Sequence, residues 1–116
     1  SCMAKLIDLE LPASEYILDK SPMTFGRAEE DGIILNDINL PRLADSSDER
    51  YRKKLRGVSR EEHIAFIEKE GAWYLTPRYD RDVYIGGRKI TGEARLENGM
   101  EIGIGVFKYR LKFSLK

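Results

Sequence analysis

Hydrophobic and polar positions alternate strictly along three stretches of the chain, at residues 5–11, 99–105 and 106–116. A period of two is typical of a half-buried β-strand, because successive side chains of a strand point to opposite faces of the sheet. The alternation predicts one apolar face in each stretch, made of Ile7, Leu9 and Leu11, of Met100, Ile102 and Ile104, and of Phe107, Tyr109, Leu111, Phe113 and Leu115.

Six further apolar runs predict short strands, at residues 15–18, 23–26, 32–35, 63–69, 72–76 and 82–85. Turn dipeptides such as Asp31-Gly32, Gly86-Gly87 and Asn98-Gly99 separate these runs. No helical periodicity alternates with the strands, which excludes a doubly wound α/β fold. The pattern therefore predicts an all-β fold, an antiparallel sandwich or barrel.

One segment, from Asn39 to Gly57, breaks the alternation. Ser46 and Glu49 have the spacing of a capping box, and Gly57 is placed to end a helix, so we expect a short helix from about Ser47 to Leu55. Basic residues near its end match the helix dipole, which is typical of a solvated helix end. The other interpretation is a basic arm beside an anion site.

Composition limits the class of protein. The chain has 116 residues, with 20 basic and 20 acidic side chains, so we expect one domain over residues 4–116 and no overall attraction to nucleic acid. The single cysteine, Cys2, excludes a disulfide framework, and residues 1–3 are interpreted as a tag or linker remnant. We find no apolar run long enough to span a membrane and expect an intracellular domain of a larger protein.

Few residues could form a catalytic or ligand-binding site, and three of them lie close together in the sequence. His63 is the only histidine and follows Ser59 and Arg60 in a turn, which gives no metal site, no cofactor site and no catalytic triad. We therefore expect no enzyme activity, and we assign His63 to holding the loop before it. If that loop lies beside Arg27, a hydroxyl and guanidinium groups would form a cradle for phosphate.

The segments "FGR", "VSREEH", "VYIGGRKI" and "LENGMEIGIG" together resemble a forkhead-associated (FHA) domain over nearly the whole chain. The resemblance implies a β-sandwich of about eleven strands. Residues 39–57, where we expect the short helix, are an insertion that makes this loop longer than is usual in the family. The resemblance also implies that loops at one end of the sandwich bind phosphothreonine in a partner protein. Arg27 matches the arginine that binds phosphate in the family, and Gly26 would shape the turn that presents it.

The sequence departs from the family pattern at the remaining positions. Ser59 stands four residues before His63 instead of three, so either a bulge returns Ser59 to the phosphate or Arg60 replaces it. Arg81 and Asp82 stand where the family has the Asn-Gly that holds the bound peptide. Gly87 falls in the following turn, where we expect it to support the loops.

Two functions follow from this pattern, beside a third interpretation as an enzyme or nucleic-acid binder outside the family, for which the sequence has no acid/base pair, phosphate-binding loop or zinc ligands. The first is a phosphothreonine-binding interaction module that uses Arg27 with Ser59 or Arg60, and Arg81 and Asp82 for the peptide. The second is a degenerate FHA domain that contacts protein partners, or oligomerises, without phosphate, in particular through residues 39–57.

Overall fold

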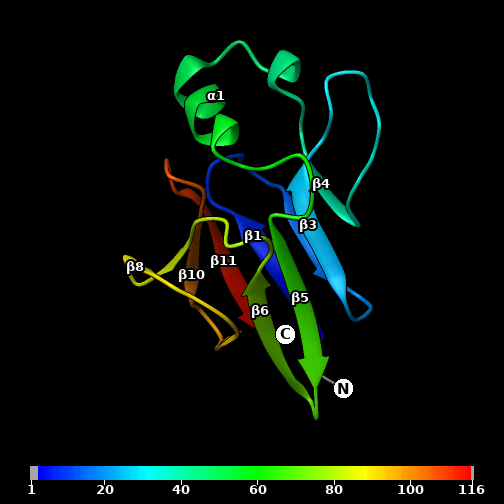
Figure 1. Ribbon diagram of the computed structural model, residues 1–116, viewed down its shortest axis with the longest axis vertical. Coiled ribbons are helices and arrows are strands. Elements are labelled where there is room, and N and C mark those ends of the chain that lie inside the picture. Colours follow the sequence, from blue (N-terminus) through cyan, green and yellow to red (C-terminus); the bar gives the residue numbers. More distant parts are fainter. Residues whose placement is uncertain (1–2, 116) are drawn as a thin grey trace.

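The computed structural model describes residues 3–115, so the interpretation of residues 1 and 2 as a remnant lies outside the described residues. Eleven strands form two sheets, as the sequence resemblance implied (Figure 1). The six-stranded sheet has the order β2 (Glu15–Leu18), β1 (Ala4–Asp8), β11 (Tyr109–Leu115), β10 (Glu101–Ile104), β7 (Val83–Ile85) and β8 (Arg88–Lys89). The five-stranded sheet has the order β4 (Ile38–Leu40), β3 (Met23–Arg27), β5 (Ile64–Lys69), β6 (Ala72–Pro77) and β9 (Ala94–Arg95).

The core lies between the two sheets. Leu6 of β1 pairs with Phe113 of β11, and both side chains are fully buried. From the other sheet, the rings of Phe25 and Phe66 meet edge to face at 6.3 Å. Each sheet thus has one apolar inner face, as expected of an aligned β-sandwich. The pairing of β3 with β4 is parallel, which departs from a wholly antiparallel arrangement.

The prediction for the first strand had the wrong face. Ala4, Leu6 and Asp8 point inward, whereas Ile7 is only partly buried. Asp8 is buried at a sheet end because its carboxylate accepts hydrogen bonds from the hydroxyls of Tyr16 at 2.7 Å and Tyr109 at 2.8 Å. Full hydrogen bonding offsets the cost of burying the carboxylate, which a hydrophobicity pattern does not register.

One further strand prediction was wrong, and the prediction of the last strand was wrong at its ends. Residues 32–35 form an exposed loop rather than a strand, and the strand that pairs with β3 begins at Ile38. The last strand begins at Tyr109, so Phe107 lies in the turn before it and is exposed, and Leu115 at the far end is exposed as well. Glycine explains the turn: Gly105 has a φ of +81°, and a Cβ there would collide with the carbonyl of Gly57.

The predicted helix exists with shifted boundaries. Helix α1 spans Glu49–Arg56 and follows a short 3-10 turn, η1, at Leu43–Asp45. Asp48, not Ser46, caps α1, since its carboxylate accepts from the backbone N–H groups of Arg50 at 3.0 Å and Tyr51 at 3.3 Å. Gly57 ends the helix as predicted. The inserted segment is shorter than expected because residues 38–40 belong to β4.

Helix α1 is packed against the sandwich at one end (Figure 1). Tyr51 and Leu55 are buried, and the Tyr51 hydroxyl lies 2.9 Å from that of Tyr109, which in turn donates to Asp8. Lys54 donates to Glu10 at 2.8 Å at the edge of the same contact. These buried contacts and the hydrogen-bond chain fix the helix relative to the strands.

Among residues 3–115, no helix is long and apolar enough to cross a membrane.

Candidate functional site

A shallow hollow of about 410 Å³ opens at the end of the sandwich where α1 finishes. Three segments meet there: the end of β3, the loop between α1 and β5, and the loop between β6 and β7. The hollow is lined by Arg27, Arg56, Gly57, Val58, Ser59, Arg60, His63, Tyr79, Asp80, Arg81 and Asp82. The lining thus includes all five residues that the sequence assigned to phosphate or peptide.

Arg27 is held in place from both its backbone and its side chain. Its backbone N–H donates to the Ser59 carbonyl at 2.8 Å, and its Nε donates to the Val58 carbonyl at 3.1 Å. The side chain is only 11% exposed. Burial lowers the pKa of Arg27 from its ordinary value, and the nearby charge of Arg60 lowers it further, whereas Glu30 opposes both. An anion bound here would therefore meet a guanidinium that has already lost much of its water.

Gly26 allows the loop after α1 to approach β3 closely. A Cβ at this position would stand 2.6 Å from Asn36 Nδ2 and 2.7 Å from the Ser59 carbonyl oxygen. Any larger side chain would push the Ser59 loop away from Arg27. Gly26 therefore shapes the site by close packing and has no need of a positive φ.

Asn36 is a supporting residue that sequence reasoning missed. Its buried amide donates to the Arg60 carbonyl at 2.8 Å and accepts from the Glu62 N–H at 2.6 Å. The side chain thus fastens the loop before β5 to the segment before β4. The only signal in the sequence was a polar residue at the end of an apolar run, which is too common to single out a function.

His63 connects two loops of the hollow. Its Nδ1 accepts from the Ser59 N–H at 2.9 Å, which places the ring proton on Nε2, and Nε2 donates to the Asp82 carbonyl at 2.8 Å. Burial lowers the pKa of His63, while the hydrogen bond to the Asp82 carbonyl opposes that change. The neutral ring has both nitrogens engaged, so no ring nitrogen is left to act as a base.

Between Ser59 and His63 the backbone turns at Glu62, whose φ is +37°. The Ser59 N–H still reaches the histidine, but the hydroxyl forms a local turn with Glu61, donating to its carbonyl at 3.0 Å. Arg60 pairs with Glu29 at 3.3 Å. Both residues line the hollow, so the geometry does not decide between Ser59 and Arg60 for the position beside Arg27.

Arg81 lies on the opposite loop with an aromatic support. Its guanidinium stands 4.7 Å from the centre of the Tyr79 ring, and its Nη1 donates to the Glu62 carbonyl at 3.4 Å. Asp82 is engaged elsewhere: its carboxylate pairs with Lys89 at 2.8 Å. The backbone of Asp82, rather than its side chain, contributes to the site through His63.

Gly87 lies outside the hollow. It occupies the two-residue turn between β7 and β8, where Gly86 and Gly87 both have positive φ, at 59° and 78°. The turn shapes the edge hairpin of the six-stranded sheet, and neither glycine is among the residues that line the hollow.

Arg56 is a site residue that the sequence did not single out. It is the last residue of α1 and lines the hollow, with its guanidinium 3.0 Å from Glu49 of the same helix. The sequence shows a run of basic residues around Arg56, but the run indicates only that the end of the helix is positively charged. Which basic residue faces the hollow depends on how α1 is docked, and the sequence does not show this.

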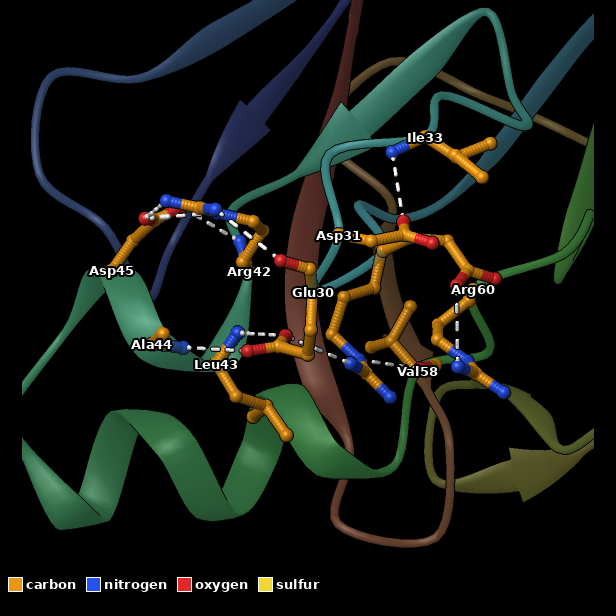
Figure 2. Close-up of polar contacts among 11 residues, drawn as sticks. Glu30, Asp31, Ile33, Arg42, Leu43, Ala44, Asp45, Val58 and Arg60 are labelled. Atoms are coloured by element: carbon orange, nitrogen blue, oxygen red, sulfur yellow. Dashed lines mark hydrogen bonds and ion pairs between the residues drawn. The ribbon is translucent and has the colours of Figure 1, made fainter.

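Acidic side chains from the loop after β3 lie against the arginines. Glu30 accepts from the backbone N–H groups of Leu43 at 2.9 Å and Ala44 at 3.2 Å, and stands 3.7 Å from Arg27. Figure 2 shows Glu30 directed toward Leu43 and Ala44, with Arg42 paired to Asp45 beside it. The loop is thus attached to η1 by charge-assisted hydrogen bonds, and its carboxylates pair with Arg27 and Arg60 from outside the lining of the hollow.

Within residues 3–115, no group of three or more His, Cys, Asp or Glu side chains is placed to hold a metal ion.

At the level of sequence, no family model and no curated protein matches this chain. Solved structures do. An FHA domain described for phosphothreonine-dependent interactions has a TM-score of 0.70 at 16% identity and covers 98% of this chain and 97% of its own. The FHA domain of CT664 from Chlamydia trachomatis has a TM-score of 0.66 at 21% identity, covering 97% and 95%.

A third structure is EmbR of Mycobacterium tuberculosis in complex with a low-affinity phosphopeptide. Its TM-score is 0.70 at 21% identity, and the match covers all of this chain but 25% of that one. The identities are low throughout, while the coverage of this chain is nearly complete. The chain therefore has the FHA fold with a divergent sequence.

Proposed function

We propose that this domain is an interaction module that binds phosphothreonine segments of partner proteins in the hollow around Arg27. One observation carries the proposal: Arg27, Ser59, Arg60 and Arg81, which come from three separate segments, line the same hollow. Solvated surface arginines have no reason to converge in this way. The neighbours described above as binding phosphothreonine or a phosphopeptide support the same function.

Arg27 is the centre of the proposed phosphate site. A guanidinium presents a fork of donors that matches two phosphate oxygens, and each charge-assisted hydrogen bond contributes roughly 1.5 to 3 kcal/mol. Its Nε is already bound to the Val58 carbonyl, which fixes the plane of the group before a ligand arrives. Arg60 or the Ser59 hydroxyl would complete the phosphate contacts, and Arg81 would bind the peptide chain.

The proposal involves recognition and no chemistry. His63 has both ring nitrogens hydrogen-bonded to backbone groups, so the histidine in the hollow supports the loops rather than a reaction. We propose an intracellular domain, within a larger protein, whose partner is a phosphorylated protein.

A second candidate function is contact with a partner that carries no phosphate. The observation that favours it is a groove of about 560 Å³ between α1 and the turn before β11, where Phe107 is 41% exposed. Lys53 stands 5.2 Å from the centre of the Phe107 ring. This groove belongs to the inserted helix and lies outside the lining of the arginine hollow.

The two candidates separate in a titration with a degenerate phosphothreonine peptide library and its unphosphorylated counterpart. We expect selective binding of the phosphorylated library, lost in Arg27→Gln and retained in Arg95→Gln, an exposed arginine on β9. Far-ultraviolet circular dichroism and urea unfolding would show that both variants are folded. Equal binding of the two libraries by a folded wild-type domain would overturn the proposal.

A further inference from the structure

The hollow holds more positive charge than one phosphate needs. Its lining contains four guanidinium groups, those of Arg27, Arg56, Arg60 and Arg81, but two carboxylates, those of Asp80 and Asp82. The Asp82 carboxylate is paired with Lys89, which is not part of the lining. A phosphothreonine carries about −1.5 to −2 charges at neutral pH, so it matches only part of the charge of the lining arginines. The glutamates that pair with Arg27, Arg56 and Arg60 lie outside the lining.

Three of these four arginines have an ion-pair partner, and the partners come from two different segments. Arg27 and Arg60 face Glu30 and Glu29 of the loop after β3. Arg56 instead pairs with Glu49, at the other end of helix α1. The Glu49 side chain is 67% exposed, and exposed ion pairs contribute little, so a ligand can replace Glu49 at small cost.

The position of Arg56 is set by the docking of α1. Leu55, the residue before it, is fully buried, and Val58, two residues after it, is buried as well. Gly57 lies against Gly105 of the turn before β11. The backbone that carries Arg56 is thus held on both sides, so binding through Arg56 costs mainly the ordering of one side chain.

We propose that Arg56 forms a second anion subsite, so that the preferred ligand carries another negative group close to the phosphothreonine. This inference rests on the proposed phosphothreonine function. The ligand class is a peptide with an acidic side chain or a second phosphate beside the first. Arg27 with Arg60 or Ser59 binds the phosphothreonine, and Arg56 binds the added negative group.

The test uses alanine-rich peptides that carry one phosphothreonine, alone or with a single Asp or phosphoserine moved through the flanking positions. We expect the best two-anion peptide to bind the full chain about tenfold more tightly than the peptide with phosphothreonine alone. In Arg56→Gln this gain should vanish, while affinity for the single-phosphate peptide changes less than about twofold. The Asp and phosphoserine series show which anion the subsite prefers.

Arg50→Gln is the matched control, because it removes the same charge from the same helix at a residue outside the lining of the hollow. It should retain the gain. A gain that is equally reduced in Arg50→Gln, or that persists in Arg56→Gln, would overturn the second subsite and leave the first intact. An Arg56 that only offset the helix dipole would alter unfolding in urea and leave the gain unchanged. Failure of the single-phosphate peptide to bind would instead overturn the proposed function.

Discussion

Two segments flank β4, and the more apolar one is the more exposed. Before β4, the apolar side chains of Ile33, Ile34 and Leu35 are 54%, 61% and 41% exposed. After β4, helix α1 has the highly charged sequence ERYRKKLR, yet it buries Tyr51 and Leu55 against the sandwich. Apolar content alone thus fails to predict which segment joins the core.

Spacing explains the difference. Tyr51 and Leu55 are four residues apart, so they lie on one face of the helix, and Tyr109 supplies a partner for the Tyr51 hydroxyl. Three consecutive apolar residues in a loop point in different directions and form no common face. The loop is held instead by ion pairs at its base, from Glu29 to Arg60 and from Glu30 to Arg27. The helix is therefore held against the sandwich by buried packing, whereas the loop is held by partly exposed ion pairs.

The largest effect should come from removing the packing of α1. Leu55→Ala deletes a fully buried side chain, and we expect it to lower the free energy of unfolding by about 2 to 5 kcal/mol, measured in urea. It should also weaken any contribution of Arg56 to binding. A loss below about 1 kcal/mol would mean that the helix is not part of the cooperative core.

Acidification should destabilise the loop between α1 and β5, where His63 accepts a hydrogen bond from the Ser59 N–H. Burial lowers the pKa of His63 below its ordinary value of 6.5, so the unfolded chain binds the proton more readily than the folded domain does. The stabilisation is therefore complete above pH 6.5 and decreases as the pH falls below it. Urea unfolding at about pH 7.5 and about pH 5 measures the change, which His63→Gln should reduce.

The Glu10 carboxylate does not titrate in the pH range of this measurement. Burial alone would raise the pKa of Glu10, but hydrogen bonds from Arg110 and Lys54 hold it below the ordinary value of 4.5. Its contribution is thus present above pH 4.5 and is lost only at lower pH. A free energy of unfolding that rises on acidification from pH 7.5 to pH 5 would contradict the role given to His63.

Removing the charge of Glu30, in the loop after β3, should raise the affinity for phosphothreonine peptides. Glu30→Gln keeps an oxygen that accepts from the η1 backbone but removes the charge beside Arg27. We expect phosphothreonine peptides to bind up to about fivefold more tightly, the effect of one exposed ion pair. Glu97→Gln removes the same charge from a residue that forms no ion pair with an arginine of the hollow, and it should leave the affinity nearly unchanged. Weaker binding in Glu30→Gln would show that the loop supports the ligand rather than competing with it.

The smallest effect on stability should come from the apolar loop itself. Ile34→Ala removes an exposed side chain, and we expect the free energy of unfolding to change by no more than about 0.5 kcal/mol. The contrast with Leu55→Ala tests the comparison directly, since both changes truncate a branched aliphatic side chain to alanine. A loss of more than about 2 kcal/mol in Ile34→Ala would mean that the loop is buried in solution.

Much of the fold could be predicted because strand periodicity is a local property. The inner face of Ile102 and Ile104 and that of Leu111 and Phe113 follow from alternation alone. Asp8 and the loop at residues 32–35 could not be predicted, since burial of a carboxylate and exposure of an apolar run depend on partners distant in the sequence. Asp8 is buried because Tyr109, more than one hundred residues away, reaches it.

The candidate site divides in the same way. Arg27, Ser59, Arg60 and Arg81 were found because their spacing resembles a known pattern. The places of Arg56 and Asn36 depend on the tertiary structure. Arg56 lines the hollow because of how α1 packs, and the Asn36 amide connects two segments that are distant in the sequence. No local signal in the sequence distinguishes them from other arginines and asparagines.

The central claim is that phosphate binds at Arg27, and nuclear magnetic resonance tests it most directly. The ¹⁵N-labelled domain would be titrated with a phosphothreonine peptide while the backbone amides and the arginine Nε–H groups are followed. We predict the largest shifts at Arg27 Nε–H and at the amides of Ser59 and Arg60, with none from the unphosphorylated peptide. Shifts confined to the groove between α1 and Phe107, or identical shifts from both peptides, would contradict the account.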